Sequence, residues 1–197
     1  MIRTAGEDGA MLDGPVLETA RLRLRPPQEA DFAGLCALMG DEQTARHIGG
    51  ATEPALTWRS MAMLMGHWMI RGYGFFSVED KATGDWVGRV GPWNPHEWPA
   101  PEVGWSILRS QWGKGYGPEA AGAALDFVFD RLGWERVIHL IAPENVNSAA
   151  VARKLGSVNT GESAQIPGFP GILTDVWAQS KADWAVNRAR LVHALTP

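Results

Sequence analysis

Three glycines at alternate positions, Gly113, Gly115 and Gly117, form the stretch of this sequence with the clearest chemistry. Glycine lets the backbone turn sharply and brings its amide groups close to a bound ligand. The residues that follow predict a helix, whose first N–H groups have no intrahelical partner and lie at the positive end of its dipole. The combination predicts a phosphate-binding turn.

Two other phosphate motifs do not fit this spacing. A dinucleotide-binding turn needs Gly-x-Gly-x-x-Gly near the start of a βαβ unit, with an acidic residue about 20 positions later. Here the pattern is Gly-x-Gly-x-Gly, and it comes past the middle of the chain, after an antiparallel hairpin pattern. A P-loop needs Ser or Thr directly after its lysine, but Lys114 is followed by Gly115.

The elements on either side of the turn must position it. Residues 102–108 alternate as a strand and lead into the turn. A helix is predicted from about 115 to 132, with Glu119 and Asp130 among the residues that face outward. A buried strand is predicted over 136–141.

The rest of the chain adds both strands and helices. Further strands are predicted at 16–25, 73–79 and 86–93, with weaker candidates at 157–161 and 174–179; helices are predicted at 31–39, 52–70 and 181–195, with a short one ending at 155. The segments 73–79 and 86–93 are joined by a short polar connection typical of a hairpin. This order predicts one mixed α/β domain over residues 15–197, preceded by a loose tail over residues 1–14.

Composition limits the class of protein. The 197 residues are 45% hydrophobic and 20% charged, with a net charge of −4. The absence of a long basic run argues against a dedicated nucleic-acid binder. No uncharged apolar run reaches membrane-spanning length, so no membrane partner is expected. One cysteine, Cys36, favours a reducing, cytoplasmic setting.

Several residues invite a chemical role and are better explained by packing. His96 and Glu97 have no further ligand at a suitable spacing, so no metal site is predicted. His139 lies within a buried strand pattern and is interpreted as a core histidine with satisfied hydrogen bonds. Five tryptophans fall near the expected site, and core or rim packing is favoured over an aromatic-walled pocket: Trp86, Trp93, Trp98, Trp105 and Trp112.

Several segments taken together resemble one known family. The glycine turn with its flanks (112–120), then Asn145-Val146-Asn147-Ser148 and Lys154-Leu155-Gly156, resemble the GNAT acetyltransferase superfamily. The segments 17–25 and 102–105 are similar to its Rim-type branch, named for N-terminal acetylation of ribosomal proteins. The resemblance covers roughly residues 16–184. It implies an α/β (α+β) fold with a mostly antiparallel central sheet, helices on both faces, and two central strands that splay apart.

The resemblance also implies a cofactor and its contacts. Acetyl-CoA would bind with its pyrophosphate on the backbone of the glycine turn, which comprises Trp112, Gly113, Lys114, Gly115, Tyr116 and Gly117. Ile107 and Leu108 would pair with the pantetheine arm, and Asn145 would contact the cofactor from the opposite wall. No metal is implied. Two positions depart from the family pattern: Trp112 replaces the usual Arg or Gln, and Ser157 replaces an aromatic residue.

Direct transfer to an amine needs a base, an oxyanion partner and a proton for the leaving thiolate. Glu102 is the candidate base, with a surface or substrate-orienting carboxylate as the alternative. Backbone N–H groups near Leu108 are candidates for the oxyanion. Many GNAT enzymes use a tyrosine as the acid, but the aligned residue here is Ala152. Ser148 is the candidate acid, with an ordinary helix cap as the alternative.

These observations predict an acetyl-CoA-dependent N-acetyltransferase acting on a primary amine. The acceptor would be a peptide N-terminus, an amino acid or another small-molecule amine, and the protein is a possible homodimer. A catalytically silent acyl-CoA-binding or regulatory domain is the main alternative, and a nucleotide-dependent oxidoreductase is a third. Acceptor specificity is expected from residues 40–75, 93–101 and 167–171.

Overall fold

The computed structural model describes residues 13–168 and 171–195, so most of the predicted tail (1–14) lies outside the described residues. The strands are β1 (Leu17–Glu18), β2 (Leu22–Arg25), β3 (Phe76–Asp80), β4 (Trp86–Trp93), β5 (Glu102–Ile107), β6 (Arg136–Ile141), β7 (Val158–Gln165) and β8 (Leu173–Ser180). The helices are α1 (Phe32–Gly40), α2 (Glu42–Ala45), α3 (Pro54–Arg71), α4 (Tyr116–Asp130), α5 (Val146–Leu155) and α6 (Lys181–Leu195). Short 3₁₀ turns lie at Glu29–Asp31 and Arg109–Gln111.

All strands belong to one sheet, in the order β1-β2-β3-β4-β5-β6-β8-β7. Every neighbouring pair is antiparallel except β5 and β6, which are parallel and share a single registered pair, Glu102 opposite Ile138. Beyond that pair the two strands are not in register and separate. The predicted mixed, mostly antiparallel sheet with splayed central strands is therefore confirmed.

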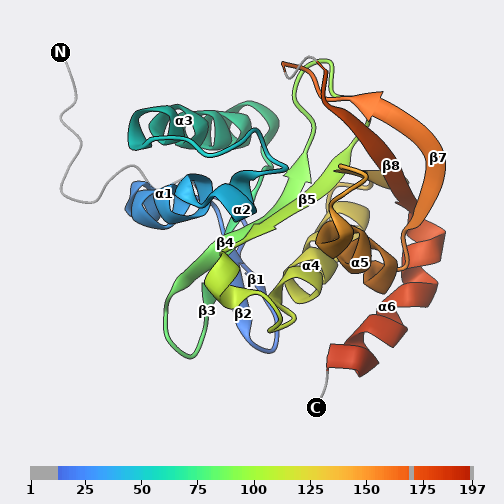
Figure 1. The fold of residues 1–197 in the computed structure, drawn as a ribbon. Coiled ribbons are helices and arrows are strands. Elements are labelled where there is room, and N and C mark those ends of the chain that lie inside the picture. The colour runs from blue at the N-terminus through green and yellow to red at the C-terminus, as the bar shows by residue number, and fades with distance from the viewer. Residues whose placement is uncertain (1–12, 169–170, 196–197) are drawn as a thin grey trace.

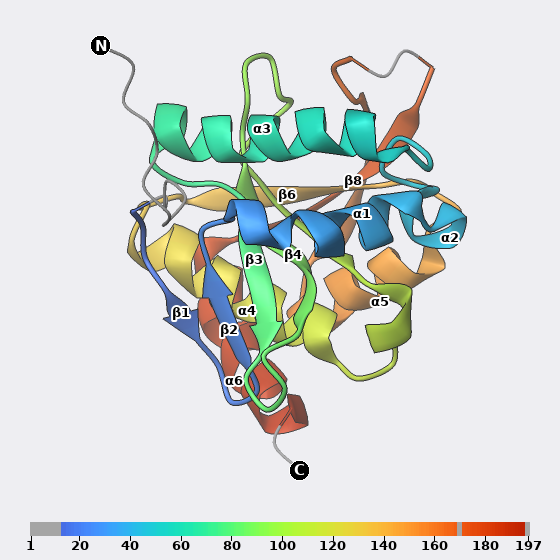
Figure 2. The same cartoon turned by 90° about the vertical axis from the view of Figure 1, so that its left-hand side faces the viewer.

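Helices cover both faces of this sheet, as predicted (Figures 1 and 2). Helix α4 packs on one face, where Ala121, Leu125 and Val128 join the larger hydrophobic cluster. Helices α1 and α3 pack on the other face, where Leu38 and Leu64 join a second cluster. The amphipathic stripes of these helices thus dictate a three-layer arrangement, because each stripe must bury itself against the sheet.

The prediction of one strand over residues 16–25 is wrong. The chain reverses at residues 19–21, so that β1 and β2 form an antiparallel pair with Leu17 opposite Leu24. The Thr19 hydroxyl accepts a hydrogen bond from the Leu22 amide at 2.9 Å, which stabilises the reversal. A side-chain cap of this kind leaves little trace in hydrophobic periodicity.

The outward orientation predicted for Glu119 is also wrong. Its carboxylate is buried and accepts from the Thr19 hydroxyl at 2.6 Å and from the Arg21 amide at 3.0 Å. The Arg21 guanidinium donates to the other carboxylate oxygen at 2.7 Å from Nε. Glu119 therefore joins the β1–β2 reversal to the first turn of α4.

Removing this carboxylate is predicted to destabilise the fold. Glu119→Ala leaves the Arg21 amide and the Thr19 hydroxyl without their shared acceptor, and we expect a loss of about 2 kcal/mol in the free energy of unfolding. Urea denaturation measures this loss. Asp130→Ala is the matched control, because Asp130 is exposed near the end of the same helix and should change stability little. Equal effects of the two substitutions would contradict the assignment.

Candidate functional site

A cavity of about 740 Å³ contains most of the residues that the sequence predicted for the site. It lies between β5 and the start of α4 on one side and the start of α5 on the other, with the α2 region on a third side. The lining includes Trp105–Ile107, Gln111–Gly113, Gly115–Pro118, Glu144–Ser148, Ala150, Val151, Gln43, Thr44 and Arg46–Ile48. This volume is in the range typical of ligand sites.

The predicted phosphate-binding turn forms one wall of the cavity. Gly113 and Gly115 have φ of 78° and 80°, the left-handed region that favours glycine. Within the described part of the chain, the backbone N–H groups from Gly113 to Gly117 donate to no acceptor in the turns and loops. These amides precede or begin α4, so they add to the positive end of its dipole.

Gly117 leaves room in the cavity for a ligand. A Cβ built at this position would meet Val151 Cγ2 at 3.6 Å and Ile107 Cγ1 at 4.0 Å, which are ordinary van der Waals contacts. A side chain there would thus occupy cavity space without a clash inside the protein. The free amides and this unfilled space fit a phosphate-bearing cofactor.

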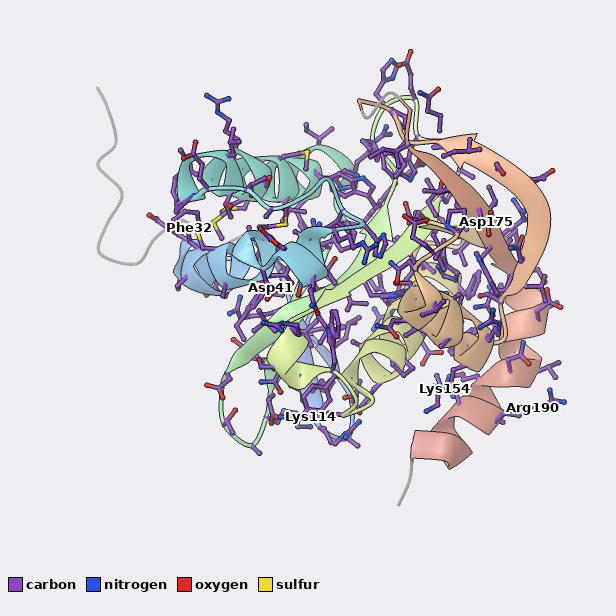
Figure 3. The ribbon with its side chains drawn as sticks, viewed as in Figure 1. Phe32, Asp41, Lys114, Lys154, Asp175 and Arg190 are labelled. Atoms are coloured by element: carbon purple, nitrogen blue, oxygen red, sulfur yellow. The ribbon has the colours of Figure 1, made fainter. Side chains whose placement is uncertain are left out.

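Side chains behind the turn hold it in place. Arg21 Nη1 donates to the Lys114 carbonyl at 2.8 Å, and its guanidinium lies 4.8 Å from the centre of the Tyr116 ring. The Tyr116 hydroxyl is hydrogen-bonded to Asp80. Lys114, labelled in Figure 3, donates to Gln111 Oε1 at 2.7 Å and is not among the cavity-lining residues of the described chain. The contributions expected from Tyr116 and Lys114 are therefore those of their backbone.

The structure places Ile107 and Leu108 differently from each other. Ile107 lines the cavity, and its carbonyl accepts from the Trp112 indole at 2.8 Å. The Leu108 amide donates to the Val87 carbonyl at 2.9 Å, and its own carbonyl accepts from the Gln111 amide at 2.9 Å. Both backbone groups of Leu108 are thus engaged within the protein, so it has no free N–H for an oxyanion.

Trp105 is the strand residue that sequence reasoning did not assign to the cofactor. It lines the cavity, and its backbone faces the edge of β5 from which β6 has separated. The period of two along the strand held the signal, because Trp105 lies two residues from Ile107 on the same side. Of the five tryptophans considered, Trp105 and Trp112 line the cavity, while Trp86, Trp93 and Trp98 belong to the second hydrophobic cluster.

Asn145 and Ser148 lie together at the start of α5, on the wall opposite the glycine turn. Asn145 is the N-cap of this helix, and its Oδ1 accepts from the Ser148 amide at 3.1 Å. The cap leaves the Asn145 Nδ2 donor and the Ser148 hydroxyl available to the cavity. The two side chains predicted for this wall are therefore brought together by one cap.

Glu102 lies at the closed end of the splay and is not among the cavity-lining residues of the described chain. Its Oε2 accepts from the Trp98 indole at 2.7 Å and its Oε1 from the Leu140 amide at 3.2 Å. Burial raises the pKa of Glu102 to about 7, although these two hydrogen bonds and the nearby Arg89 charge act in the opposite direction. A carboxylate with this pKa can exchange a proton near neutral pH.

The α2 region contributes cavity residues that the sequence pattern did not single out. His47 Nδ1 lies 3.6 Å from Glu144 Oε1, so a contact joins the α2 side to the α5 side. Asp41, labelled in Figure 3, caps α2 through the Thr44 amide and lies 2.9 Å from Arg109 Nε beyond β5. Asp41 and His47 fall inside residues 40–75, one of the three segments predicted to determine acceptor specificity.

Over residues 13–168 and 171–195, no group of three or more His, Cys, Asp or Glu side chains is arranged to hold a metal ion. Within the same part of the chain, every helix is too short or too polar to cross a membrane.

Comparison with known proteins identifies the sequence pattern. The acetyltransferase (GNAT) domain family matches residues 21–158. YkkB of Bacillus subtilis is 33% identical over 148 residues, which is 71% of this chain and 83% of YkkB. The N-acetyltransferase p20 of Bacillus licheniformis is 27% identical over 165 residues, covering 82% of this chain and 92% of that protein.

Solved structures agree with this match. An acetyltransferase from Agrobacterium tumefaciens superposes with a TM-score of 0.75 at 27% identity, covering 89% of this chain and all of that one. The ribosomal-protein-S5-alanine acetyltransferase of Vibrio fischeri shares the fold with a TM-score of 0.68 at 20% identity, covering 86% of this chain and 98% of that one. The predicted GNAT fold is thus confirmed.

The raised pKa of Glu102 predicts a pH-dependent effect on stability. Between the usual carboxyl pKa of 4.5 and about 7, the folded protein binds more protons at Glu102 than the unfolded chain does, so this residue lowers stability as pH rises. Glu102→Gln removes that loss. We expect the stability of the variant relative to the natural protein to improve by about 2 to 3 kcal/mol from pH 5 to pH 8.

Urea denaturation of both proteins at the two pH values measures the difference. The contribution of His139, whose pKa is lowered to about 4 by burial, is common to both proteins and cancels. A stability difference that is the same at pH 5 and pH 8 would show that Glu102 titrates as it does in the unfolded chain.

Proposed function

The chain belongs to the GNAT acetyltransferase family, and from this premise we propose that it transfers the acetyl group of acetyl-CoA to a primary amine. The observation that carries the proposal is the wall of the cavity from Gly113 to Gly117. Within the described residues, these backbone amides have no acceptor in the turns and loops. The missing side chain of Gly117 leaves space in front of them. A pyrophosphate supplies the acceptors that these amides lack.

Three groups of residues would hold this cofactor. The amides from Gly113 to Gly117 would bind the pyrophosphate. The Trp112 amide donates to the Arg109 carbonyl at 3.1 Å, so Trp112 would contribute only as part of the cavity lining. The open edge of β5 at Trp105 would pair with the pantetheine arm, Ile107 would line the cavity beside it, and Asn145 Nδ2 would donate to the arm from the opposite wall. When bound, acetyl-CoA supplies an acyl carbon activated as a thioester.

Two side chains would move protons. Ser148 lines the cavity, and its hydroxyl would donate a hydrogen bond or a proton to the departing sulfur. Glu102 would take up the ammonium proton of the acceptor through a water molecule, because its carboxylate lies behind the cavity lining. Its pKa of about 7 suits this role, since a base must be ionised to act and still hold a proton afterwards.

The acceptor would enter beside the α2 region. Gln43, Arg46 and His47 line this side of the cavity and provide both hydrogen-bond donors and acceptors. A peptide N-terminus, an amino acid or another small amine each fits the proposed transfer. Further parts of the proposal are a single domain over residues 15–197, a cytoplasmic location, no resident metal and a possible homodimer.

A second candidate function is an acyl-CoA-binding domain without turnover. Ala152 is fully buried and provides no proton at the position where many family members have a tyrosine. Under this alternative the cavity would bind the cofactor, and no amine would be acetylated.

Filling the space at Gly117 is predicted to weaken CoA binding without destabilising the fold. Gly117→Ala adds a methyl group in the cavity wall but makes only ordinary contacts within the protein, so stability should be unchanged or slightly improved. We expect the dissociation constant for CoA to rise about tenfold, as measured by isothermal titration calorimetry.

Gly66→Ala is the matched control, because Gly66 lies within α3 with open space at its Cβ position. This variant should bind CoA as the natural protein does. Unchanged CoA binding by Gly117→Ala would show that the ligand does not approach the start of α4.

A thiol-release assay tests the proposed transfer. With acetyl-CoA and a panel of peptides, amino acids, polyamines and aminoglycosides, we expect amine-dependent release of CoA by at least one class. The kcat/KM of that reaction should rise with pH and level off above about pH 7, as Glu102 loses its proton.

Two variants check the assigned roles in this assay. Ser148→Ala should lower kcat by about tenfold to a hundredfold while leaving CoA affinity unchanged. Glu102→Gln should remove the pH-dependent rise. Tight CoA binding without thiol release across the whole panel would favour the silent acyl-CoA-binding domain instead.

A further inference from the structure

Side-chain hydrogen bonds replace the backbone ladder where β5 and β6 separate. At their registered pair, the Ile138 amide donates to the Pro101 carbonyl at 2.9 Å. In a continued parallel ladder, the Leu140 amide would next donate to the Val103 carbonyl. Instead the Leu140 amide donates to Glu102 Oε1, and the Val103 carbonyl accepts from His139 Nδ1 at 2.6 Å. The two backbone groups that would form this next ladder hydrogen bond are thus each capped by a side chain.

The hydrogen bonds of His139 determine which of its nitrogens carries the proton. Nδ1 must be protonated, because its partner is a carbonyl that can only accept. Nε2 is therefore the acceptor, and the Ser157 hydroxyl donates to it at 2.9 Å. The Ser157 oxygen in turn accepts from Gln179 Nε2 at 2.8 Å. A chain of donors runs from Gln179 through Ser157 and His139 to Val103.

This buried chain lies directly behind the cavity wall. The His139 ring is 1% exposed, and its centre lies 4.8 Å from the centre of the Trp105 ring. Trp105 lies between two carbonyls that are already occupied, since His139 caps Val103 and the Trp112 indole caps Ile107. The backbone of Trp105 is therefore the part of the open edge that is left for a ligand.

We propose that His139 is a positioning residue for acyl-CoA, held by Ser157 in the tautomer that caps Val103 and so keeps the β5 edge open at Trp105. Without the imidazole, the Val103 carbonyl would lose its partner. The Leu140 amide would then be the nearest backbone donor in register, and β6 would extend its ladder along β5 and cover the Trp105 edge. The inference rests on the proposed function only in naming acyl-CoA as the ligand of that edge.

The first test observes the tautomer without any ligand. Long-range ¹H–¹⁵N NMR of histidine-labelled protein at pH 7 should show His139 as a neutral imidazole with its proton on Nδ1, and its signal is assigned by its absence from the spectrum of His139→Asn. His67, whose Nδ1 contacts the Tyr73 carbonyl at 2.7 Å, should give a second signal of this kind in both spectra. In Ser157→Ala the His139 signal should shift or broaden, because Nε2 loses its donor. A proton on Nε2 of His139 in the natural protein would overturn the inference, whatever the protein does with CoA.

The second test measures CoA binding by calorimetry in a graded series of variants. His139→Leu removes the cap, and we expect the dissociation constant for CoA to rise about tenfold or more. His139→Asn keeps an amide donor near the position of Nδ1, so it should restore much of the affinity lost in His139→Leu. His96→Leu is the matched control, because its side chain is 92% exposed, and it should leave affinity unchanged.

The outcomes separate this inference from the proposed function. If the natural protein does not bind CoA, the proposed function fails, while the tautomer experiment still decides whether His139 caps Val103. If His139→Leu unfolds cooperatively and binds CoA as tightly as the natural protein, the positioning role is wrong. If His139→Leu does not fold, Ser157→Ala replaces it, and a loss of CoA affinity with retained cooperative unfolding is the expected result.

Discussion

The site depends on one constraint: two neighbouring strands separate in the middle of a sheet, and the backbone groups this releases must find other partners. An unpaired buried amide or carbonyl costs roughly 1–3 kcal/mol, so a splay without caps would close. Here the Glu102 carboxylate accepts from the Leu140 amide, and the His139 imidazole donates to the Val103 carbonyl. The cavity between β5 and α5 exists because these side chains replace the ladder.

The glycine turn depends on a second set of contacts, made from behind. Its free amides can face the cavity only if the turn keeps its shape without hydrogen bonds of its own. Arg21 supplies part of that support by donating to the Lys114 carbonyl, and Glu119 binds Arg21 in turn. The N-terminal strands therefore help to shape this wall of the cavity although none of their residues lines it.

One departure from the family pattern has a structural explanation. Ser157 stands where an aromatic residue is usual, and in this fold its hydroxyl donates to His139 while accepting from Gln179. A polar residue is needed there because a buried imidazole with a bare Nε2 would lack a partner. The residues at 139 and 157 are thus explained together, as two ends of one hydrogen bond.

The sequence by itself determined the glycine turn, the family and the mixed sheet, because each follows from the types and spacing of residues close together along the chain. It offered Ser148 as a possible helix cap, whereas the structure gives that role to Asn145. It did not reveal the partner of Glu119, which lies about a hundred positions away at Thr19 and Arg21, nor the engagement of the Leu108 amide by Val87. Only the tertiary structure decided these points. Local periodicity shows which face of an element is buried, whereas hydrogen-bond pairing between distant elements depends on how the strands are ordered and where two of them separate.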